Sequence, residues 1–199
     1  MCNEVRRTVA LGQIRDDFSF TRIPLRFPEG APNLAPLDSI RITDPNAIIR
    51  PGTTDEPGAE LVVRRWSWPG PGGKPVFNMR SEGRDFGFSA TGGRCLVVAD
   101  GFYEYTAPAD PRAKRKHKWL FTKRDEDWFC IAGLWRPTAV GEAFTLLTTE
   151  PGPDVAPYHS RQIALLSRDD WARWLDPAVA ATDMLKPLAA GSLDVKQIC

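Results

Sequence analysis

The chain has 199 residues, of which 42% are hydrophobic and 26% are charged, which is typical of a soluble globular protein. The formal net charge is only +1, so a uniformly basic protein is excluded but a local basic groove is not. Because the chain lacks both a run of about 18 apolar residues and a secretory signal, we expect no membrane span and a cytoplasmic protein with reduced cysteines.

In chain order, the first three quarters of the sequence predict mainly strands. A short helix is expected within residues 5–16, and the Pro- and Gly-rich segments 28–36, 51–60 and 69–75 predict loops. Segments rich in β-branched and aromatic residues predict strands, namely residues 39–43, 61–68, 94–105, 118–122, 128–135 and 143–149. Residues 112–118 predict a basic hairpin loop between two of these strands.

Fewer segments predict helices. One is expected within residues 81–90. The clearest helix covers residues 168–175, with Ser167 as N-cap and Asp170 in place of the capping-box Glu. Asp176 is expected to begin a further helix that ends near residue 185. Together the elements predict an α+β fold, a single compact domain over residues 1–199 with a mainly antiparallel, distorted, β-barrel-like sheet flanked by short helices.

The cysteines at positions 2, 95, 130 and 199 form no C-x-x-C pair, so we expect neither a metal site nor another cofactor. Cys2 has a specific chemistry once Met1 is removed, because its α-amine and its thiol are then on adjacent carbons. The amine condenses with an aldehyde to an imine, and the thiol closes on the imine carbon to form a thiazolidine ring. Taken alone, however, a cysteine at position 2 is better explained as an accident of sequence.

Three other segments contain candidate polar residues. Asn78 and Arg80 follow a predicted strand. Glu104 shares a strand face with an aromatic residue, where a raised pKa would let it transfer protons near pH 7, although an edge-strand Glu paired to an Arg is a common alternative. His159 and Arg161 lie in a loop, where a histidine is more often a surface residue than a catalyst.

Together these segments resemble one family. Cys2, the N-x-R-x-E segment at 78–82, the Ala-Asp-Gly-Phe-Tyr-Glu segment at 99–104 and the H-x-R segment at 159–161 resemble the SRAP family, the SOS-response-associated peptidase domain of abasic-site processing proteins. Asn-Leu-Ala-Pro at 33–36 and Trp-Ser-Trp-Pro at 66–69 resemble further parts of that family. The matches follow the family order from residue 2 to about residue 175.

The resemblance implies a protein that senses abasic sites in single-stranded DNA during the DNA damage response and crosslinks to them through Cys2. Asn78 would orient Cys2 or the sugar, Glu104 would move protons, and His159 would protonate or hydrogen-bond the sugar oxygen. The implied partner is single-stranded DNA, bound by a monomer at damaged sites in the nucleoid. The residues implied to contact DNA are Arg80 and Arg161 at phosphates, Trp66 and Trp68 at bases, and Arg6 and Arg7 as additional cations.

The sequence departs from the family pattern at three places. Asn3 and Glu4 stand where the family has Gly-Arg, which removes a cation that Arg6 and Arg7 would replace. Gln and Ile follow the H-x-R segment where the family has Met-Pro, and little sequence follows residue 195. These departures concern DNA affinity and stability more than the chemistry at Cys2.

Two other functions stay open. The chain is a cysteine peptidase if Cys2 is an N-terminal nucleophile with His159 or Glu104 as its base. It is a non-catalytic single-stranded DNA-binding module if the arginines and tryptophans act alone, which leaves Cys2 unexplained. Trp66 and Trp68 also have an alternative place, in the hydrophobic core.

Overall fold

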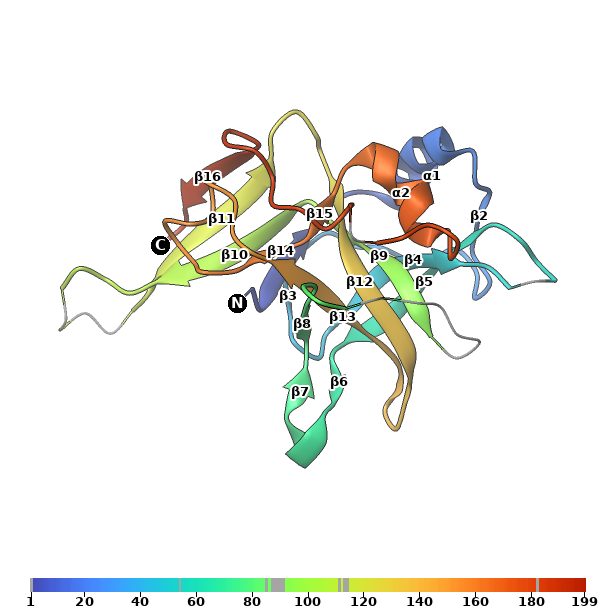
Figure 1. The fold of residues 1–199 in the computed structure, drawn as a ribbon, viewed down its shortest axis with the longest axis horizontal. Helices are drawn as coiled ribbons and strands as arrows, with labels where there is room; N and C mark the ends of the chain where they lie inside the picture. Colours follow the sequence, from blue (N-terminus) through green and yellow to red (C-terminus); the bar gives the residue numbers. More distant parts are fainter. Residues whose placement is uncertain are drawn as a thin grey trace.

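The computed structural model describes residues 2–53, 55–84, 86, 92–110, 112, 115–181 and 183–199. Most of these residues lie in or between β-strands (Figure 1). A five-stranded sheet has the order β16-β11-β10-β1-β3. Its strands are β1 (Glu4–Arg7), β3 (Leu37–Arg41), β10 (Gly101–Thr106), β11 (His117–Lys123) and β16 (Leu193–Gln197).

A larger, mainly antiparallel sheet forms the middle of the molecule, in the order β14-β13-β12-β9-β4-β5-β2, with β15 beside β12 and β8 beside β13. Its strands are β2 (Leu25–Arg26), β4 (Pro45–Pro51), β5 (Ala59–Trp66), β8 (Asn78–Arg80), β9 (Gly93–Ala99), β12 (Phe129–Thr138), β13 (Gly141–Thr149), β14 (Gln162–Ile163) and β15 (Leu165–Leu166). β6 (Trp68–Pro69) and β7 (Pro75–Val76) pair with each other around the short 3₁₀ helix η2 (Pro71–Gly73).

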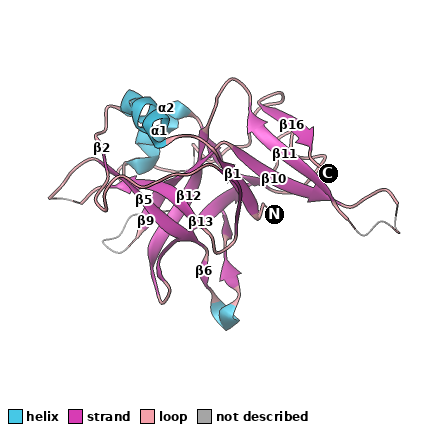
Figure 2. Cartoon of the chain, turned by 180° about the vertical axis from the view of Figure 1, so that it is seen from behind, coloured by secondary structure: helices cyan, strands magenta, loops and turns pink. Residues whose placement is uncertain are grey.

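The α-helices α1 (Leu11–Phe18) and α2 (Arg168–Leu175) lie together at one end of the molecule, away from β10, β11 and β16 (Figure 2). The 3₁₀ helix η1 (Ser19–Thr21) continues α1. Phe18 of α1 stacks on Trp171 of α2, with ring centroids 6.4 Å apart. The described residues include no helix with the length and apolar character needed to span a bilayer.

Side-chain alternation along the central sheet creates two hydrophobic cores. In β9, Leu96 and Val98 face the core that contains the helices, whereas Cys95 and Val97 face the core that is shared with the five-stranded sheet. All four side chains are fully buried. Since successive strand residues point to opposite faces, the central sheet is covered on both sides, by helices on one and by strands on the other.

The expected α+β fold, with mainly antiparallel strands and short flanking helices, is confirmed. All six predicted strand segments are strands within a few residues, and the predicted 94–105 segment is two strands, β9 and β10. The predicted helix at 168–175 is α2, with the predicted bounds. Ser167 stands at its N-cap, but its hydroxyl donates to Asp170 Oδ2 at 2.7 Å and accepts no hydrogen bond from the helix backbone.

The other helix predictions had different outcomes. The short helix expected within residues 5–16 is α1, but it begins only at Leu11 and continues to Phe18, because residues 4–7 pair with β10 and β3 as strand β1. The helix expected from Asp176 to about residue 185 is not formed, since the described residues of this segment lie in turns and bends. The Asp176 carboxylate accepts from the backbone N–H of Ala178 at 2.8 Å. In the 81–90 segment, residues 81–84 and 86 form no helix, and the remaining residues lie outside the described part.

Candidate active site

Cys2 is held against the central sheet by a side chain from a distant strand. Asn78 Nδ2 donates to the Cys2 backbone carbonyl at 2.7 Å, and β8 is itself fixed by parallel pairing of Asn78 with Leu146 of β13. The Cys2 thiol is buried and donates to the Glu4 carbonyl at 3.4 Å. Asn78 Oδ1 is buried and has no hydrogen-bond partner among the described residues. Asn78 therefore contacts the backbone of Cys2, while its part in a reaction stays a prediction.

Glu104 is a buried carboxylate in an internal strand. β10 lies between β11 and β1, and the Glu104 side chain is 2% exposed. Within the described residues, Glu104 Oε1 has no hydrogen-bond partner, and no salt bridge joins this carboxylate to an arginine. Burial raises the pKa of Glu104 to about 7. The alternative of an edge-strand Glu paired to an Arg therefore does not describe this residue.

The pKa values of Cys2, Glu104 and His159 are all affected by the positive charge at the start of the chain. Burial and the Glu104 charge both raise the pKa of the Cys2 thiol. Burial lowers the pKa of His159, and the positive charge at the N-terminus of the chain lowers it further. The same terminal charge also acts on Glu104 and on Cys2. Glu104 thus acts on Cys2, while the placement of His159 at the same site stays a prediction.

The orientation of His159 is fixed by the backbone that follows it. The backbone N–H of Arg161 donates to His159 Nδ1 at 2.9 Å. The backbone N–H of His159 donates to the Val155 carbonyl at 3.0 Å. Because Nδ1 accepts a hydrogen bond, the neutral imidazole carries its proton on Nε2. His159 can thus act as a neutral hydrogen-bond donor.

The two arginines predicted at phosphates differ in their surroundings. Arg80 follows Met79 in β8 and its side chain is exposed. Arg161 instead forms two hydrogen bonds to the Glu82 carboxylate, at 2.6 and 2.9 Å, and one to the Thr148 carbonyl at 2.7 Å. Its side chain is 12% exposed. Arg80 is therefore open to an anion, whereas Arg161 is already paired.

The additional cations predicted from sequence are used inside the protein. Arg6 Nε donates to Asp100 Oδ1 at 2.5 Å. Arg7 is buried and donates to Asn46 Oδ1 and to the Ala35 carbonyl, both at 3.1 Å. These contacts correct the expectation that Arg6 and Arg7 replace a missing cation on the DNA path, because neither guanidinium is presented as an open anion site.

The two tryptophans predicted to stack on bases are core residues. Trp66 is fully buried, donates its indole N–H to the Phe77 carbonyl at 2.8 Å and stacks on Phe144. Trp68 is 5% exposed, and the guanidinium of Arg136 lies 4.4 Å from its ring centre. Protein atoms thus cover both rings, and we no longer place Trp66 and Trp68 on a DNA-binding surface.

Asp100 is a structural residue that the sequence analysis quoted without giving it a role. It is buried between β9 and β10 and accepts hydrogen bonds from Arg6, from the backbone and hydroxyl of Thr8, and from the Val9 N–H at 2.9 Å. The next residue has no room for a side chain, because a Cβ atom on Gly101 would lie 2.8 Å from the Leu120 side chain. Asp100 therefore fixes the end of β1, the strand that begins just after Cys2.

The sequence analysis also missed a buried polar cluster at Glu4. Its carboxylate accepts from Ser39 Oγ at 2.5 Å, from Lys118 Nζ at 2.8 Å and from the Tyr105 hydroxyl. Lys118 is thus the second residue of β11 and pairs with Glu4, rather than belonging to the predicted solvated loop at 112–118. Residues 111, 113 and 114 lie outside the described part. The sequence feature that could have indicated this cluster is the departure from the family pattern at Asn3 and Glu4, where the family has Gly-Arg.

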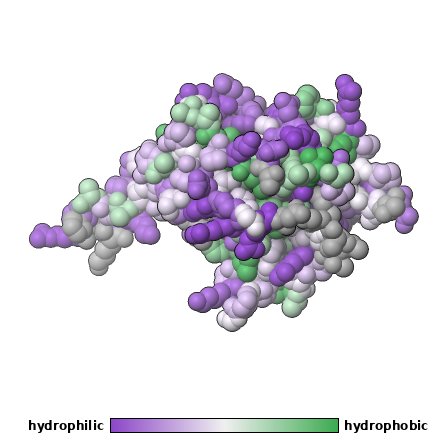
Figure 3. Space-filling model, viewed as in Figure 1, coloured by the Kyte–Doolittle hydropathy of each residue, from purple (hydrophilic) through white to green (hydrophobic). Residues whose placement is uncertain are grey.

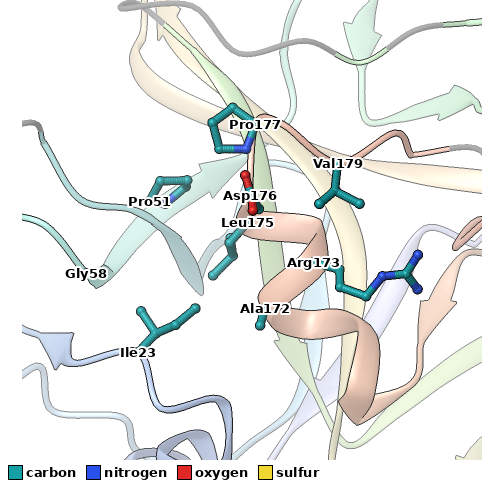
Figure 4. Close-up of a pocket in the computed structure, with 9 residues that line it drawn as sticks. All are labelled: Ile23, Pro51, Gly58, Ala172, Arg173, Leu175, Asp176, Pro177 and Val179. Carbon is teal, nitrogen blue, oxygen red and sulfur yellow. The ribbon is translucent and has the colours of Figure 1, made fainter.

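A cavity lies on the helix side of the molecule, at the end of α2. It has a volume of about 400 Å³ and is lined by the end of α2, by the segment that follows this helix, by the end of β4 and by loop residues on either side of β2 and β5 (Figure 4). In the described part of the chain, no group of His, Cys, Asp and Glu side chains could hold a metal ion. The lining residues are Ile23, Pro51, Gly58, Ala172, Arg173, Leu175, Asp176, Pro177 and Val179.

Comparisons with known proteins identify the family and the fold of the chain. The model of a family described as SOS response associated peptidase (SRAP) matches residues 1–199. The abasic site processing protein YoaM of Bacillus subtilis is 26% identical over 203 residues, covering 94% of this chain and 85% of that protein. The abasic site processing protein HMCES of Gallus gallus is 30% identical over 121 residues, covering 48% of this chain and 36% of that protein.

Crystal structures of two bacterial proteins share the fold. A protein from Bacteroides thetaiotaomicron has a TM-score of 0.73 at 17% identity, covering 100% of this chain and 92% of that chain. A protein from Bordetella bronchiseptica has a TM-score of 0.69 at 23% identity, and both chains are covered completely. With the family match over the whole chain, these findings show that the chain belongs to the SRAP family.

Proposed function

We propose that this protein processes abasic sites in single-stranded DNA by forming a covalent thiazolidine crosslink through Cys2 once Met1 is removed. The observation that carries the proposal is the hydrogen bond from Asn78 to the backbone of Cys2, together with a buried carboxylate, Glu104, whose charge acts on the Cys2 thiol. An abasic site in its ring-opened form is an aldehyde, the partner that an N-terminal 1,2-aminothiol requires.

The reaction is proposed in two bond-forming steps. The Cys2 α-amine attacks the sugar C1′ aldehyde, and loss of one water gives an imine. The Cys2 sulfur then adds to the same carbon, and the thiol proton ends on the nitrogen, so one water is lost overall. Ring closure is intramolecular, and holding the reacting groups in place gives it a large rate advantage. The hydrogen bond from Asn78 to the Cys2 carbonyl supplies this fixed geometry.

Glu104 is proposed as the proton carrier. Its pKa of about 7 means that both the acid and the carboxylate are populated near neutral pH, the condition under which a general acid–base group works best. The raised pKa of the Cys2 thiol keeps that thiol protonated, so closing the ring requires a base. His159 is proposed to hydrogen-bond the sugar oxygen through Nε2–H during ring opening.

Arg80 is proposed as the first phosphate contact, because its guanidinium is exposed two residues after Asn78. Arg161 reaches a phosphate only if it leaves Glu82, to which it makes two charged hydrogen bonds. We therefore expect Arg161 to position His159 and β13, and to contact DNA only after its hydrogen bonds to Glu82 break.

The state of the thiol favours crosslinking over the cysteine peptidase alternative. Cysteine peptidases depend on a thiolate whose pKa is strongly lowered, whereas burial raises the pKa of Cys2. A non-catalytic DNA-binding module is disfavoured by Glu104 Oε1 and Asn78 Oδ1, which are buried and have no hydrogen-bond partner in the described part of the chain. Such atoms cost free energy in a binding module but are useful when a donor is brought to them during a reaction.

The test is incubation with a single-stranded oligonucleotide that contains one abasic site, followed by denaturing electrophoresis. The unsubstituted protein is expected to give a heat-stable adduct, and Cys2→Ala none. Cys2→Ser is expected to give only an imine that borohydride traps, since a hydroxyl closes on an imine far less readily than a thiol. A normal heat-stable adduct with Cys2→Ala would show that the linkage uses another residue.

A further inference from the structure

Beyond Glu104, the inner face of the five-stranded sheet continues into a group of aromatic side chains. Glu104 of β10 lies opposite Trp119 of β11, and the side chains of directly opposed residues point to the same face of a sheet. Two residues away, Phe102 lies opposite Phe121, and these rings stack with their centroids 4.8 Å apart. Both phenylalanines belong to the core that contains Cys2. Trp119 therefore shares with Glu104 the face of the sheet that covers this core.

Trp119 is held in one orientation on this face. Its indole N–H donates to Thr106 Oγ1 at 2.9 Å. Thr106 is two residues after Glu104 in β10, so both of these side chains point to the same face. The Trp119 side chain is half-buried and packs against the core that contains Cys2. The anchored indole is thus a fixed surface beside Glu104, against which another segment can pack.

Tyr158, in the loop between β13 and β14, packs on this surface. Its ring lies edge-on to Trp119 with the centroids 4.7 Å apart, and edge-on to Phe121 with the centroids 5.2 Å apart, an arrangement that aromatic rings favour. In Figure 1 the loop crosses β10 and β11, and the ring contacts show that it lies against them. Figure 3 shows hydrophilic residues over most of the face seen in that view, with hydrophobic residues in separate small groups. Tyr158 is therefore seated in a local aromatic contact rather than in a broad apolar patch.

The rest of this loop is fixed as well. Its beginning is tied to β14, because the backbone N–H of Gly152 donates to Oε1 of the buried Gln162 at 2.9 Å. Its middle is anchored by the fully buried side chain of Val155. The backbone N–H groups of Tyr158 and His159 both donate to the Val155 carbonyl, at 2.8 and 3.0 Å. Tyr158 and His159 therefore belong to one compact turn, and the place where the Tyr158 ring docks determines where His159 lies.

We propose that Tyr158 is a positioning residue for His159. By docking on Trp119, the Tyr158 ring holds the imidazole that follows it at the face of the sheet that carries Glu104. The proposal rests on the proposed function, since it names what brings His159 to the sugar that reacts with Cys2. One ring contact links the segment of His159 to the residue directly opposite Glu104. Because misplacement of a reacting group by about 1 Å can cost about 10²-fold in rate, loss of this contact should affect the reaction more than the binding of DNA.

The test compares Tyr158→Ala with Tyr158→Phe, which keeps the ring, and with Trp119→Leu, which removes the other ring of the same contact. The matched control is Phe27→Ala, because Phe27 is also half-buried but packs against the core that contains the helices. Two quantities are measured for each variant, after thermal unfolding has checked that it is folded. One is the rate of crosslinking to an abasic single-stranded oligonucleotide. The other is the dissociation constant for the tetrahydrofuran analogue of that oligonucleotide, which has no aldehyde.

Tyr158→Ala and Trp119→Leu are expected to slow crosslinking by up to about 10²-fold and to leave the dissociation constant unchanged, whereas Tyr158→Phe and Phe27→Ala react at the unsubstituted rate. In a double variant with His159→Ala, Tyr158→Ala should cause no further loss, because no imidazole is left to position. An unchanged rate, additive losses or an equally slow Tyr158→Phe would overturn the proposal. A dissociation constant that rises as much as the rate falls would overturn it too, by making Tyr158 a DNA contact.

A second measurement does not depend on the reaction. Diethyl pyrocarbonate acylates neutral imidazoles, and peptide mapping gives separate rates for His159 and for the reference His117, which lies edge-on to Trp119. Tyr158→Ala should speed the modification of the half-buried His159 toward the rate of an exposed histidine and leave the His117 rate unchanged. An unchanged His159 rate would overturn the proposal. If the unsubstituted protein gives no crosslink but Tyr158→Ala still exposes His159, only the proposed function fails.

Discussion

The buried carboxylates Glu104 and Glu4 make opposite predictions about stability. Burial raises the pKa of Glu104 from its ordinary value of 4.5 to about 7, so the folded state favours the neutral form of this side chain. A group of this kind contributes stability below pH 4.5 that is lost as the pH rises through about 7. The difference between the two pKa values corresponds to about 3 kcal/mol.

Glu104→Gln keeps the shape of the side chain but removes its ionisation. At pH 8.5 the variant is therefore expected to be more stable than the unsubstituted protein by as much as about 3 kcal/mol. The advantage should shrink to nothing near pH 4, where both side chains are neutral. Urea unfolding at the two pH values, with equal m-values, measures this difference directly.

Glu4→Gln is the matched control. Burial raises the pKa of Glu4, but hydrogen bonds from Lys118, Ser39 and Tyr105 outweigh that effect, and the pKa lies below its ordinary value. Ionised Glu4 thus contributes stability that is lost as the pH falls. The substitution should destabilise the protein at pH 8.5 and less so near pH 4. If Glu104→Gln also destabilises the protein at pH 8.5, the inference that Glu104 is an unpaired, desolvated carboxylate is refuted.

The remaining predictions concern residues that fix the site. Asp100→Ala removes the acceptor for Arg6, Thr8 and Val9 and should lower the free energy of unfolding by about 3 kcal/mol, measured by urea unfolding; an unchanged midpoint would contradict its anchoring role. Arg161→Ala should lower stability by about 1 kcal/mol and leave the salt slope of DNA binding unchanged, whereas Arg80→Ala should make that slope shallower by about 0.7. A shallower slope with Arg161→Ala would return Arg161 to the phosphate path.

Local sequence patterns were sufficient for the long strands and for α2, because alternation of apolar residues and an N-cap serine are properties of neighbouring residues. They were insufficient for β1. This four-residue strand is defined by its partners, β10 and β3, and the register pairs Val5 with Phe102 and Ile40. Because these partners are distant in the sequence, the four residues of β1 contain no local pattern that predicts the pairing.

The same distinction applies to the site. Motif segments predicted Cys2, Asn78, Glu104 and His159, and the fold joins Asn78 to the backbone of Cys2 by a hydrogen bond. Which cations are open could not be predicted, since it depends on carboxylates from other segments, such as Glu82 at Arg161. The burial of Trp66 also depends on tertiary packing, since a tryptophan in a strand suits a core and a base-stacking surface equally well.

The most direct test of the central claim is peptide mapping by mass spectrometry after reaction with an abasic oligonucleotide and nuclease digestion. We predict that the N-terminal peptide begins at Cys2, lacks Met1, and carries the sugar remnant with the loss of one water. That modified peptide should resist reduction by borohydride, because a thiazolidine contains no imine. An adduct on any other peptide, or an N-terminal peptide that retains Met1 and is nevertheless crosslinked, would contradict the account.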